Sequence, residues 1–342
     1  MSSSSKANQT PESGEPSTRK RLLYFVAFGG AVIAIVVGAA ALMLGDLFGR
    51  WNSGTLREPK GLAQGVQIAP FLSLNDTRLF PYGIAPSGEA GEFYLSLFGG
   101  SAVRKVSTDG TMRFFAQLQA PGALAFNGGV LYVIDYSEVG ALTSGSLKRI
   151  AADGTLSNVS ESPAARGLPL FAGLVADRLG HLYLTHPENG SVWRITEDGT
   201  ATLFWGAPQV ANTRPSTTAL AYDRLNNALI VADSANGTLY RLTIGETAES
   251  EMIYRQQGFD PRALAVDAFG RVLVAAWQGD NGFLYRLETD GKLVALAEGF
   301  RQPTGILYRE GIAYVVSSGT FGLIGGVEVA PPFRVDAVTL PE

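Results

Sequence analysis

Val103-Arg104-Lys105-Val106 and the turn Asp109-Gly110-Thr111 after it form the first copy of a pattern that recurs along this chain. The turn returns at a spacing of about 45 residues, as in repeat architectures. Its later copies are Asp153-Gly154-Thr155, Asp198-Gly199-Thr200 and Asp290-Gly291-Lys292, with a degenerate copy near Ile244-Gly245-Glu246. The apolar–x–basic–apolar run recurs at 147–150, 192–195, 239–242 and 284–287. A repeat of this length that contains only strands predicts the blades of a β-propeller.

Two further strands can be assigned in each repeat. The inner strand is short and apolar, which suits the crowded centre of a ring where both faces of a strand are buried. These inner strands are expected at 83–85, 123–126, 173–176, 219–222, 263–266 and 305–308. The second strands are expected at 93–95, 131–133, 182–184, 229–231, 272–274 and 313–315. The sequence therefore predicts an all-β, six-bladed β-propeller of four-stranded blades over residues 66–342.

The last blade lacks a clear fourth strand after Gly326-Val327-Glu328-Val329, which is expected to be its third. The segment Val66-Gln67-Ile68-Ala69-Pro70-Phe71-Leu72 has no other place in the pattern. We expect it to pair with the last blade and close the ring, because an open ring leaves two unpaired strand edges. Residues 335–340 are the alternative closing strand.

Composition restricts the function classes. The chain has 342 residues, of which 46% are hydrophobic and 17% charged, so it is long enough for a repeat domain with a substantial core. Its formal net charge is −4 and no basic stripe follows residue 21, so nucleic-acid binding is not expected. There is no cysteine, which excludes thiolate catalysis, zinc–thiolate sites and disulfides.

The N-terminal region predicts a membrane anchor. Residues 1–21 are polar, are expected to be disordered, and end in Arg19-Lys20-Arg21. Residues 22–44 carry no charge and are long enough to cross a bilayer as a helix. Because positive flanks stay in the cytoplasm, we expect a single-pass cell-membrane protein with a cytoplasmic N-terminus, a linker at 45–65 and an extracytoplasmic propeller.

Two details of the expected membrane helix remain open. Ala39-Ala40-Ala41 offers a small-residue site for cleavage, so the segment is alternatively a signal peptide. Gly30, Ala34 and Gly38 share one helix face and could pack against another helix, although such residues are also ordinary constituents of membrane helices.

The repeat resembles known propeller families. Its order is Pro-x-Gly, inner strand, Asp-x-x-Gly, Leu-Tyr-Val, apolar–x–Arg–Ile and Asp-Gly-Thr, and it resembles NHL-repeat propellers. It is also similar to the six-bladed group that contains gluconolactonases, senescence marker protein, paraoxonases and strictosidine-synthase-like proteins. The stretch Phe259-Asp260-Pro261-Arg262-Ala263-Leu264-Ala265 resembles the ScyD/ScyE-type propellers of the scytonemin cluster. This resemblance covers about residues 66–342 and is specific for the fold rather than for one activity.

One face of the predicted ring should carry the function. The loops between second and third strands and the loops between blades share this face, which we call the irregular face. The Asp-Gly turns lie on the opposite face, which we call the Asp-Gly face. Variable loops on a rigid scaffold favour binding. On the irregular face they begin at Asp135, His186, Asp233, Trp277 and Ser317.

Asp135, His186 and Asp233 are expected at equivalent strand ends in three consecutive blades, with Glu188 close by. Two carboxylates and an imidazole could bind a metal or transfer protons. Alternatively, each aspartate caps the following loop through its backbone amides. Adjacent blades could also hold these groups too far apart to share one ion.

Arginine and aromatic residues gather near the blade-to-blade turns of the same face. They could anchor a partner protein or attract an anionic ligand, because such residues dominate interfaces. Alternatively, the arginines point into solvent. The candidate binding residues of the irregular face are Asp135, His186, Glu188, Asp233, Trp277, Asp280, Arg78, Tyr82, Arg214, Arg262 and Arg301.

The resemblance to gluconolactonases implies a divalent metal in the central channel, bound by Glu, Asn and Asp at the starts of inner strands. The matching positions here hold Tyr82, Gly122, Ala172, Thr217, Arg262 and Thr304. None offers a carboxylate or an amide oxygen, which such cations require. We therefore expect a non-catalytic binding or assembly module without a cofactor, for an unknown protein or small molecule. The alternatives are a lactonase or hydrolase with a different site, or a streptogramin-lyase-like enzyme, suggested by His186-Pro187-Glu188.

Overall fold

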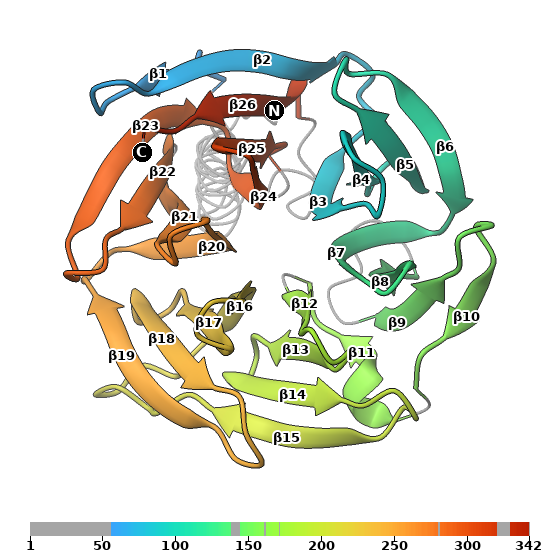
Figure 1. Ribbon diagram of the computed structural model, residues 1–342, viewed down its shortest axis with the longest axis vertical. Helices are drawn as coiled ribbons and strands as arrows, with labels where there is room; N and C mark the ends of the chain where they lie inside the picture. Colours follow the sequence, from blue (N-terminus) through green and yellow to red (C-terminus); the bar gives the residue numbers. More distant parts are fainter. Residues whose placement is uncertain are drawn as a thin grey trace, which may run out of the picture. The chain divides into compact units, whose positions relative to one another are not determined.

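The computed structural model describes residues 56–137, 144–160, 162–170, 172–279, 281–319 and 329–341. Their strands form six antiparallel sheets arranged around a central axis (Figure 1). The prediction of an all-β, six-bladed propeller with four-stranded blades is confirmed.

The chain builds the blades in order, each from its inner strand outward. Blade 1 consists of β3 (Pro81–Pro86), β4 (Glu92–Leu97), β5 (Ala102–Ser107) and β6 (Met112–Gln117). Blade 2 consists of β7 (Ala120–Asn127), β8 (Val130–Tyr136), β9 (Gly145–Ile150) and β10 (Leu156–Asn158), with β11 (Arg166–Leu168) also paired to β9. Blade 3 consists of β12 (Leu174–Ala176), β13 (Leu182–His186), β14 (Ser191–Ile195) and β15 (Ala201–Gly206). Blade 4 consists of β16 (Thr217–Asp223), β17 (Ala228–Asp233), β18 (Thr238–Thr243) and β19 (Glu249–Arg255). Blade 5 consists of β20 (Asp260–Val266), β21 (Val272–Gln278), β22 (Asn281–Leu287) and β23 (Leu293–Phe300).

Blade 6 closes the ring with strands from both ends of the propeller. Its order is β24 (Pro303–Arg309), β25 (Ile312–Ser317), β26 (Phe333–Thr339) and β2 (Gln67–Leu74). The N-terminal strand therefore closes the ring, as predicted. The third strand is β26, so the expectation that it lies at 326–329 is wrong. The sequence pattern does not show the long connection that precedes β26. The two candidate closing segments are thus neighbours in one sheet rather than alternatives.

The recurring Asp-Gly turns have a common geometry. In each turn the aspartate Oδ1 accepts a hydrogen bond from the amide two residues later, at 2.9 Å in the turn of Asp109 and 3.0 Å in that of Asp198. The glycine adopts a left-handed conformation, with φ of 81° at Gly110 and 82° at Gly199. Aspartate supplies the side-chain acceptor and glycine adopts the left-handed conformation without strain, which explains why the motif recurs.

Close contact between inner strands requires glycine. A Cβ placed on Gly83 would lie 2.5 Å from the Gly122 carbonyl oxygen of the next blade. Ser96 fixes this approach, because its Oγ accepts from the Gly83 amide at 2.7 Å and donates to the Gly122 oxygen at 2.7 Å. Blade 1 is therefore bonded to blade 2 at the start of its inner strand.

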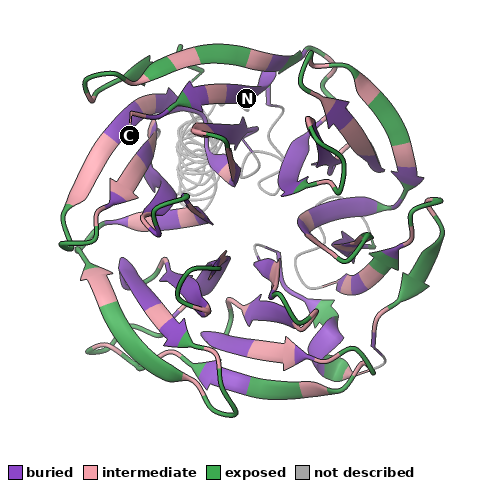
Figure 2. Ribbon diagram, viewed as in Figure 1, coloured by how far each residue is buried: buried purple, intermediate pink, exposed green. Residues whose placement is uncertain are grey.

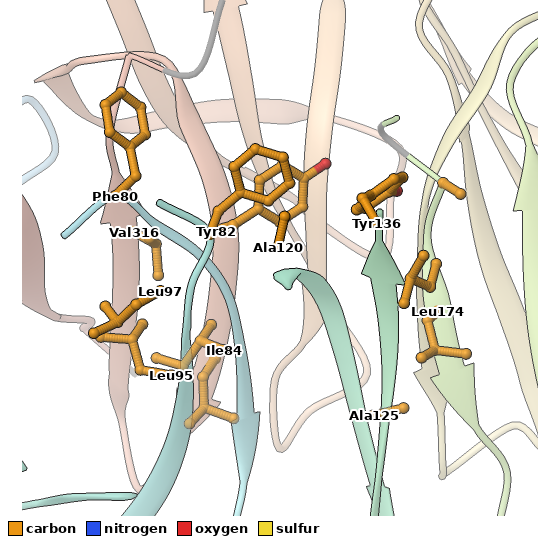
Figure 3. Packing of buried hydrophobic residues seen from close by; sticks show 14 of the residues in the cluster. Phe80, Tyr82, Ile84, Leu95, Leu97, Ala120, Ala125, Tyr136, Leu174 and Val316 are labelled. Carbon is orange, nitrogen blue, oxygen red and sulfur yellow. The ribbon is translucent and has the colours of Figure 1, made fainter. Parts of the chain in front are cut away.

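Buried side chains fill the space between the blades, whereas the outermost strands are largely exposed (Figure 2). Phe98 lies between Tyr82 and Tyr136, with both ring-centroid distances 5.8 Å. Figure 3 shows Tyr82 and Tyr136 at the interface of blades 1 and 2. The Tyr136 hydroxyl donates to the Pro169 carbonyl at 3.1 Å, so this fully buried polar group is satisfied.

The predicted linker at 45–65 is described from residue 56 onward. Its residues Lys60–Gly61 form β1, which pairs with β23 at the outer edge of blade 5. No helix among the described residues is long and apolar enough to cross a bilayer. The predicted membrane helix at 22–44, with Gly30, Ala34 and Gly38, lies outside the described residues.

Candidate functional site

A central channel of about 280 Å³ runs between the inner strands of all six blades. Its wall is mainly alanine, glycine, leucine and valine. The polar or ionisable side chains of its described lining are Tyr82, Thr218, Tyr222, Arg224, Arg262, Thr304 and Tyr308. The side chains of this described lining include no carboxylate, imidazole, carboxamide or amine, so their polar groups are hydroxyls and guanidiniums.

Arg262 is the charged group at the irregular-face mouth of this channel. It lies on β20, and its guanidinium carbon is 4.3 Å from the centroid of the Trp277 ring. Its Nε is 2.7 Å from Asp260 Oδ1. Burial raises the pKa of Asp260, and the charge of Arg262 opposes that rise. The guanidinium of Arg262 is therefore held in position at the channel mouth, and the Asp260 carboxylate balances its charge.

The expectation that Trp277 lies in a surface loop is wrong. It is a buried residue of β21, and its indole Nε1 donates to the Pro303 carbonyl at 3.1 Å. The sequence suggests that an irregular loop begins at Trp277, but β21 continues through Gln278. The Trp277 ring packs against the guanidinium of Arg262. Asp280, also a candidate, lies outside the described residues.

Asp135 and Asp233 hold loops in place. Asp135 Oδ1 accepts from the amides of Gln119 and Ala120, both at 3.0 Å. Burial raises the Asp135 pKa, and these two amides oppose the rise. Asp233 is fully buried and accepts from the Ser216 amide at 2.9 Å and from the Asn236 side chain at 2.7 Å. Asp233 also accepts from the Asn236 amide at 3.3 Å and so caps the following loop, as the alternative expected. Asp135 instead holds the segment before the inner strand of its own blade.

His186 is half-buried, and its Nε2 lies 3.1 Å from the carbonyl oxygen of Ala164. Burial lowers the pKa of its imidazole, which favours the neutral form. Glu188 is exposed. Neither residue lines the channel, and nor do Asp135 and Asp233. Within the described part of the chain, no three Asp, Glu or His side chains come together as a metal site.

The other arginine and aromatic candidates do not form one surface. Arg78 is exposed and forms an ion pair with Asp76 at 2.8 Å, and Arg214 is exposed. Arg301 is buried, donates to the carbonyls of Ala330 at 2.6 Å and Pro332 at 2.9 Å, and desolvation lowers its pKa to about 10. Of this group only Arg262 and Tyr82 reach the channel.

The donor set at the channel mouth does not fit the metal that the gluconolactonase resemblance implies. The six matching positions provide two glycine or alanine residues, two threonines, one tyrosine and one arginine. Thr217 is turned away, with its hydroxyl donating to the Ser191 carbonyl at 3.1 Å, and Thr218 lines the channel instead. An arginine charge and neutral hydroxyls do not replace the carboxylates that a hard divalent cation needs.

Sequence reasoning missed the opposite mouth of the channel. On the Asp-Gly face, Tyr222, Arg224 and Tyr308 line both the channel and an adjoining hollow of about 540 Å³. Arg224 is exposed and lies in the loop between β16 and β17. The run Asp223-Arg224-Leu225-Asn226 closely matches Asp177-Arg178-Leu179-Gly180 of blade 3, so the sequence carried no signal that singles out this mouth.

Solved structures with the same fold include enzymes of two kinds. A gluconolactonase from Xanthomonas campestris superposes with a TM-score of 0.61 at 15% identity, covering 84% of this chain and 96% of that one. A virginiamycin B lyase from Staphylococcus aureus, solved in an inactive form with quinupristin, superposes with a TM-score of 0.54 at 13% identity, covering 81% of this chain and all of that one. A luciferin-regenerating enzyme gives 0.58 at 14% identity, covering 80% of this chain and 95% of that one.

These similarities confirm the expected six-bladed propeller fold, which gluconolactonase-like proteins and streptogramin B lyases share. No protein-family model matches the chain, and no curated protein matches it significantly. At such identities the likeness concerns the fold alone.

Proposed function

We propose that this propeller is a non-catalytic binding module whose ligand contacts the channel mouth on the irregular face. The composition of the channel wall carries the proposal. Its described residues offer groups that bind, but no carboxylate, imidazole or thiol that would serve as general base, metal ligand or nucleophile. Among the carboxylates and the histidine considered for this face, Asp135, Asp233 and His186 are bonded to backbone groups.

Arg262 is the residue through which this mouth would bind. Its position over Trp277 is fixed before a ligand arrives, so little conformational entropy is lost on binding. Its half-buried guanidinium can still donate to acceptors in the channel. Thr218 and Thr304 line the same passage, and their hydroxyls donate to the carbonyls of Pro261 at 3.1 Å and Tyr82 at 2.8 Å.

Replacing Arg262 with alanine should weaken ligand binding by about 2 kcal/mol, as expected for an interface anchor. The substitution is combined with Asp260→Asn, so that no buried carboxylate loses its partner. The probes are metabolite-sized compounds selected by ligand-observed NMR on the full-length protein, with affinities then measured by calorimetry. Arg78→Ala, at an exposed site outside the channel, is the matched control. If the parent protein, the Arg262→Ala/Asp260→Asn variant and the Arg78→Ala variant bind with equal affinity, the ligand does not contact this channel mouth.

The alternative function is an enzyme of the lactonase or lyase type. What supports it is the fold shared with a gluconolactonase and with streptogramin B lyases. Such an enzyme would need Asp135, His186 or Asp233 to exchange their present partners for substrate, or the exposed Glu188 to contact it. These four residues are the first to replace if turnover of a lactone or a streptogramin is detected.

We further propose that the propeller is anchored in the cell membrane by residues 22–44 and faces away from the cytoplasm. The basic triplet before this apolar segment supports that orientation. Protease added to intact spheroplasts should degrade the propeller, while the protein fractionates with membranes before treatment. Protection of the propeller, or its release as a soluble species, would contradict the proposal.

A further inference from the structure

The hollow at the channel mouth on the Asp-Gly face, here called the Asp-Gly mouth, combines an apolar wall with guanidinium groups. It measures about 540 Å³ and is lined by residues of blades 1, 4, 5 and 6. Most of its lining side chains are apolar or aromatic: Pro86, Tyr222, Leu225, Val266, Ala268, Leu307 and Tyr308. The others are Ser87, Asp223, Arg224, Asp267 and Arg309. A concave, mainly apolar site with a few polar groups is typical of small-molecule binding.

Both carboxylates of this lining are buried and bonded within their own turns. Asp223 Oδ1 accepts from the amides of Leu225 at 3.1 Å and Asn226 at 3.2 Å, and its Oδ2 accepts from the Asn226 side chain at 2.7 Å. Asp267 is paired with Arg271, whose Nε lies 2.6 Å from Asp267 Oδ2. Donors of the protein therefore already compensate both negative charges.

The accessible charges of the lining are those of its two arginines. Arg309 is half-buried, pairs through Nε with the exposed Glu310 at 3.3 Å, and donates through Nη1 to the Glu92 carbonyl at 3.3 Å. Arg224 is exposed, and no hydrogen bond or ion pair joins its guanidinium to any other residue that the structure describes. Arg224 also lines both the channel and the hollow. Its guanidinium is therefore available to an anionic ligand, and it can donate two parallel hydrogen bonds to one carboxylate.

The place of Arg224 in the fold distinguishes it from a similar arginine in blade 3. The turn Asp177-Arg178-Leu179 has the same sequence as the turn that carries Arg224. It also has the same cap, because Asp177 Oδ1 accepts from the Leu179 amide at 2.8 Å. Arg178 is exposed, yet it lines neither the channel nor this hollow. The two arginines therefore form a matched pair, of which only Arg224 lies at the mouth.

We propose that the Asp-Gly mouth binds a small apolar monocarboxylate, whose acid group accepts from Arg224 and whose aromatic or aliphatic body packs against Leu225 and Tyr308. Leu225 is 66% exposed, so a ligand there would remove apolar surface from water. Because Arg309 is already paired, one guanidinium is left to balance one negative charge, which favours a monoanion over a phosphate or a dicarboxylate. This site does not depend on the ligand proposed for the irregular face, since Arg262 lies at the opposite mouth of the channel.

Phenylbutyrate and octanoate, titrated into the full-length protein and followed by ligand-observed NMR, test the proposal. At least one of these acids should bind, and its uncharged amide, phenylbutyramide or octanamide, should bind roughly tenfold more weakly. Arg224→Gln should weaken binding of the acid by a similar factor. Arg178→Gln is the matched control and should leave the affinity unchanged. Ala268→Phe, at an exposed position of the lining, should fill part of the hollow and weaken binding as well.

Three outcomes would overturn the proposal: neither acid binds, the amide binds as well as its acid, or Arg224→Gln leaves the affinity unchanged. The Arg262→Ala/Asp260→Asn variant separates this site from the irregular-face mouth, and it should bind the acids as the parent protein does. Loss of binding in that variant, with none in Arg224→Gln, would place the acid at the irregular face and reject the site proposed here. Melting temperatures of all variants should match that of the parent protein, because the replaced side chains lie at the surface or lining of the channel mouths and in an exposed turn.

Discussion

Replacing Gly83 with alanine should lower the free energy of unfolding by about 3 kcal/mol, the upper range for forcing an extra carbon into a packed interior. The new Cβ would meet the Gly122 carbonyl oxygen at 2.5 Å and the Leu124 amide nitrogen at 3.1 Å. Both are backbone atoms of blade 2, so no side chain can move aside. Separating the blades would also break the Ser96 hydrogen bonds that join them.

Chemical denaturation of the parent protein and the variant measures this loss. Gly206→Ala is the matched control, because a Cβ there has no heavy atom within 4 Å and should change stability by less than about 0.5 kcal/mol. If both variants lose the same amount, the inner strands of blades 1 and 2 do not approach as closely as described.

Deleting residues 1–74 should lower the melting temperature by roughly 10 °C or more, or abolish cooperative unfolding. The deletion removes β2, whose Leu72 and Leu74 are buried against blade 6 and whose Phe71 ring packs on Tyr314 at 5.1 Å. Burying each such side chain is worth about 2 kcal/mol. Loss of β2 also leaves β26 as an unpaired edge, which favours aggregation.

Deletion of residues 1–55 is the control for this experiment, because it keeps both β1 and β2. Differential scanning calorimetry should show this shorter deletion melting like the parent propeller. A deletion of residues 1–74 with an unchanged melting temperature would mean that β2 does not contribute to ring closure.

The repeat made the fold predictable from sequence. Each Asp-Gly turn has a local cause, the left-handed glycine and the aspartate cap, so it recurs wherever the same turn is built. The inner and second strands could also be assigned from local residue types, because short apolar runs recur in each repeat. The strand β26 was harder to place, because it follows a connection that no other blade contains and its pairing with β2 is non-local.

The candidate site was less predictable, because it depends on which way side chains point at blade interfaces. Trp277 and Arg301 read as loop residues, yet both are buried against neighbouring backbone. The positions of Asp135 and Asp233 at strand ends were foreseen, but their hydrogen-bond partners come from another segment of the blade.

The proposed absence of catalysis is tested most directly by measuring bound metal and lactone hydrolysis on the same preparation. Full-length protein, purified from cells supplied with calcium, manganese and zinc, is analysed for metal and then assayed with gluconolactone. The proposal predicts substoichiometric metal and no hydrolysis above the uncatalysed rate. Stoichiometric metal, together with hydrolysis that a chelator abolishes and the added ion restores, would contradict it.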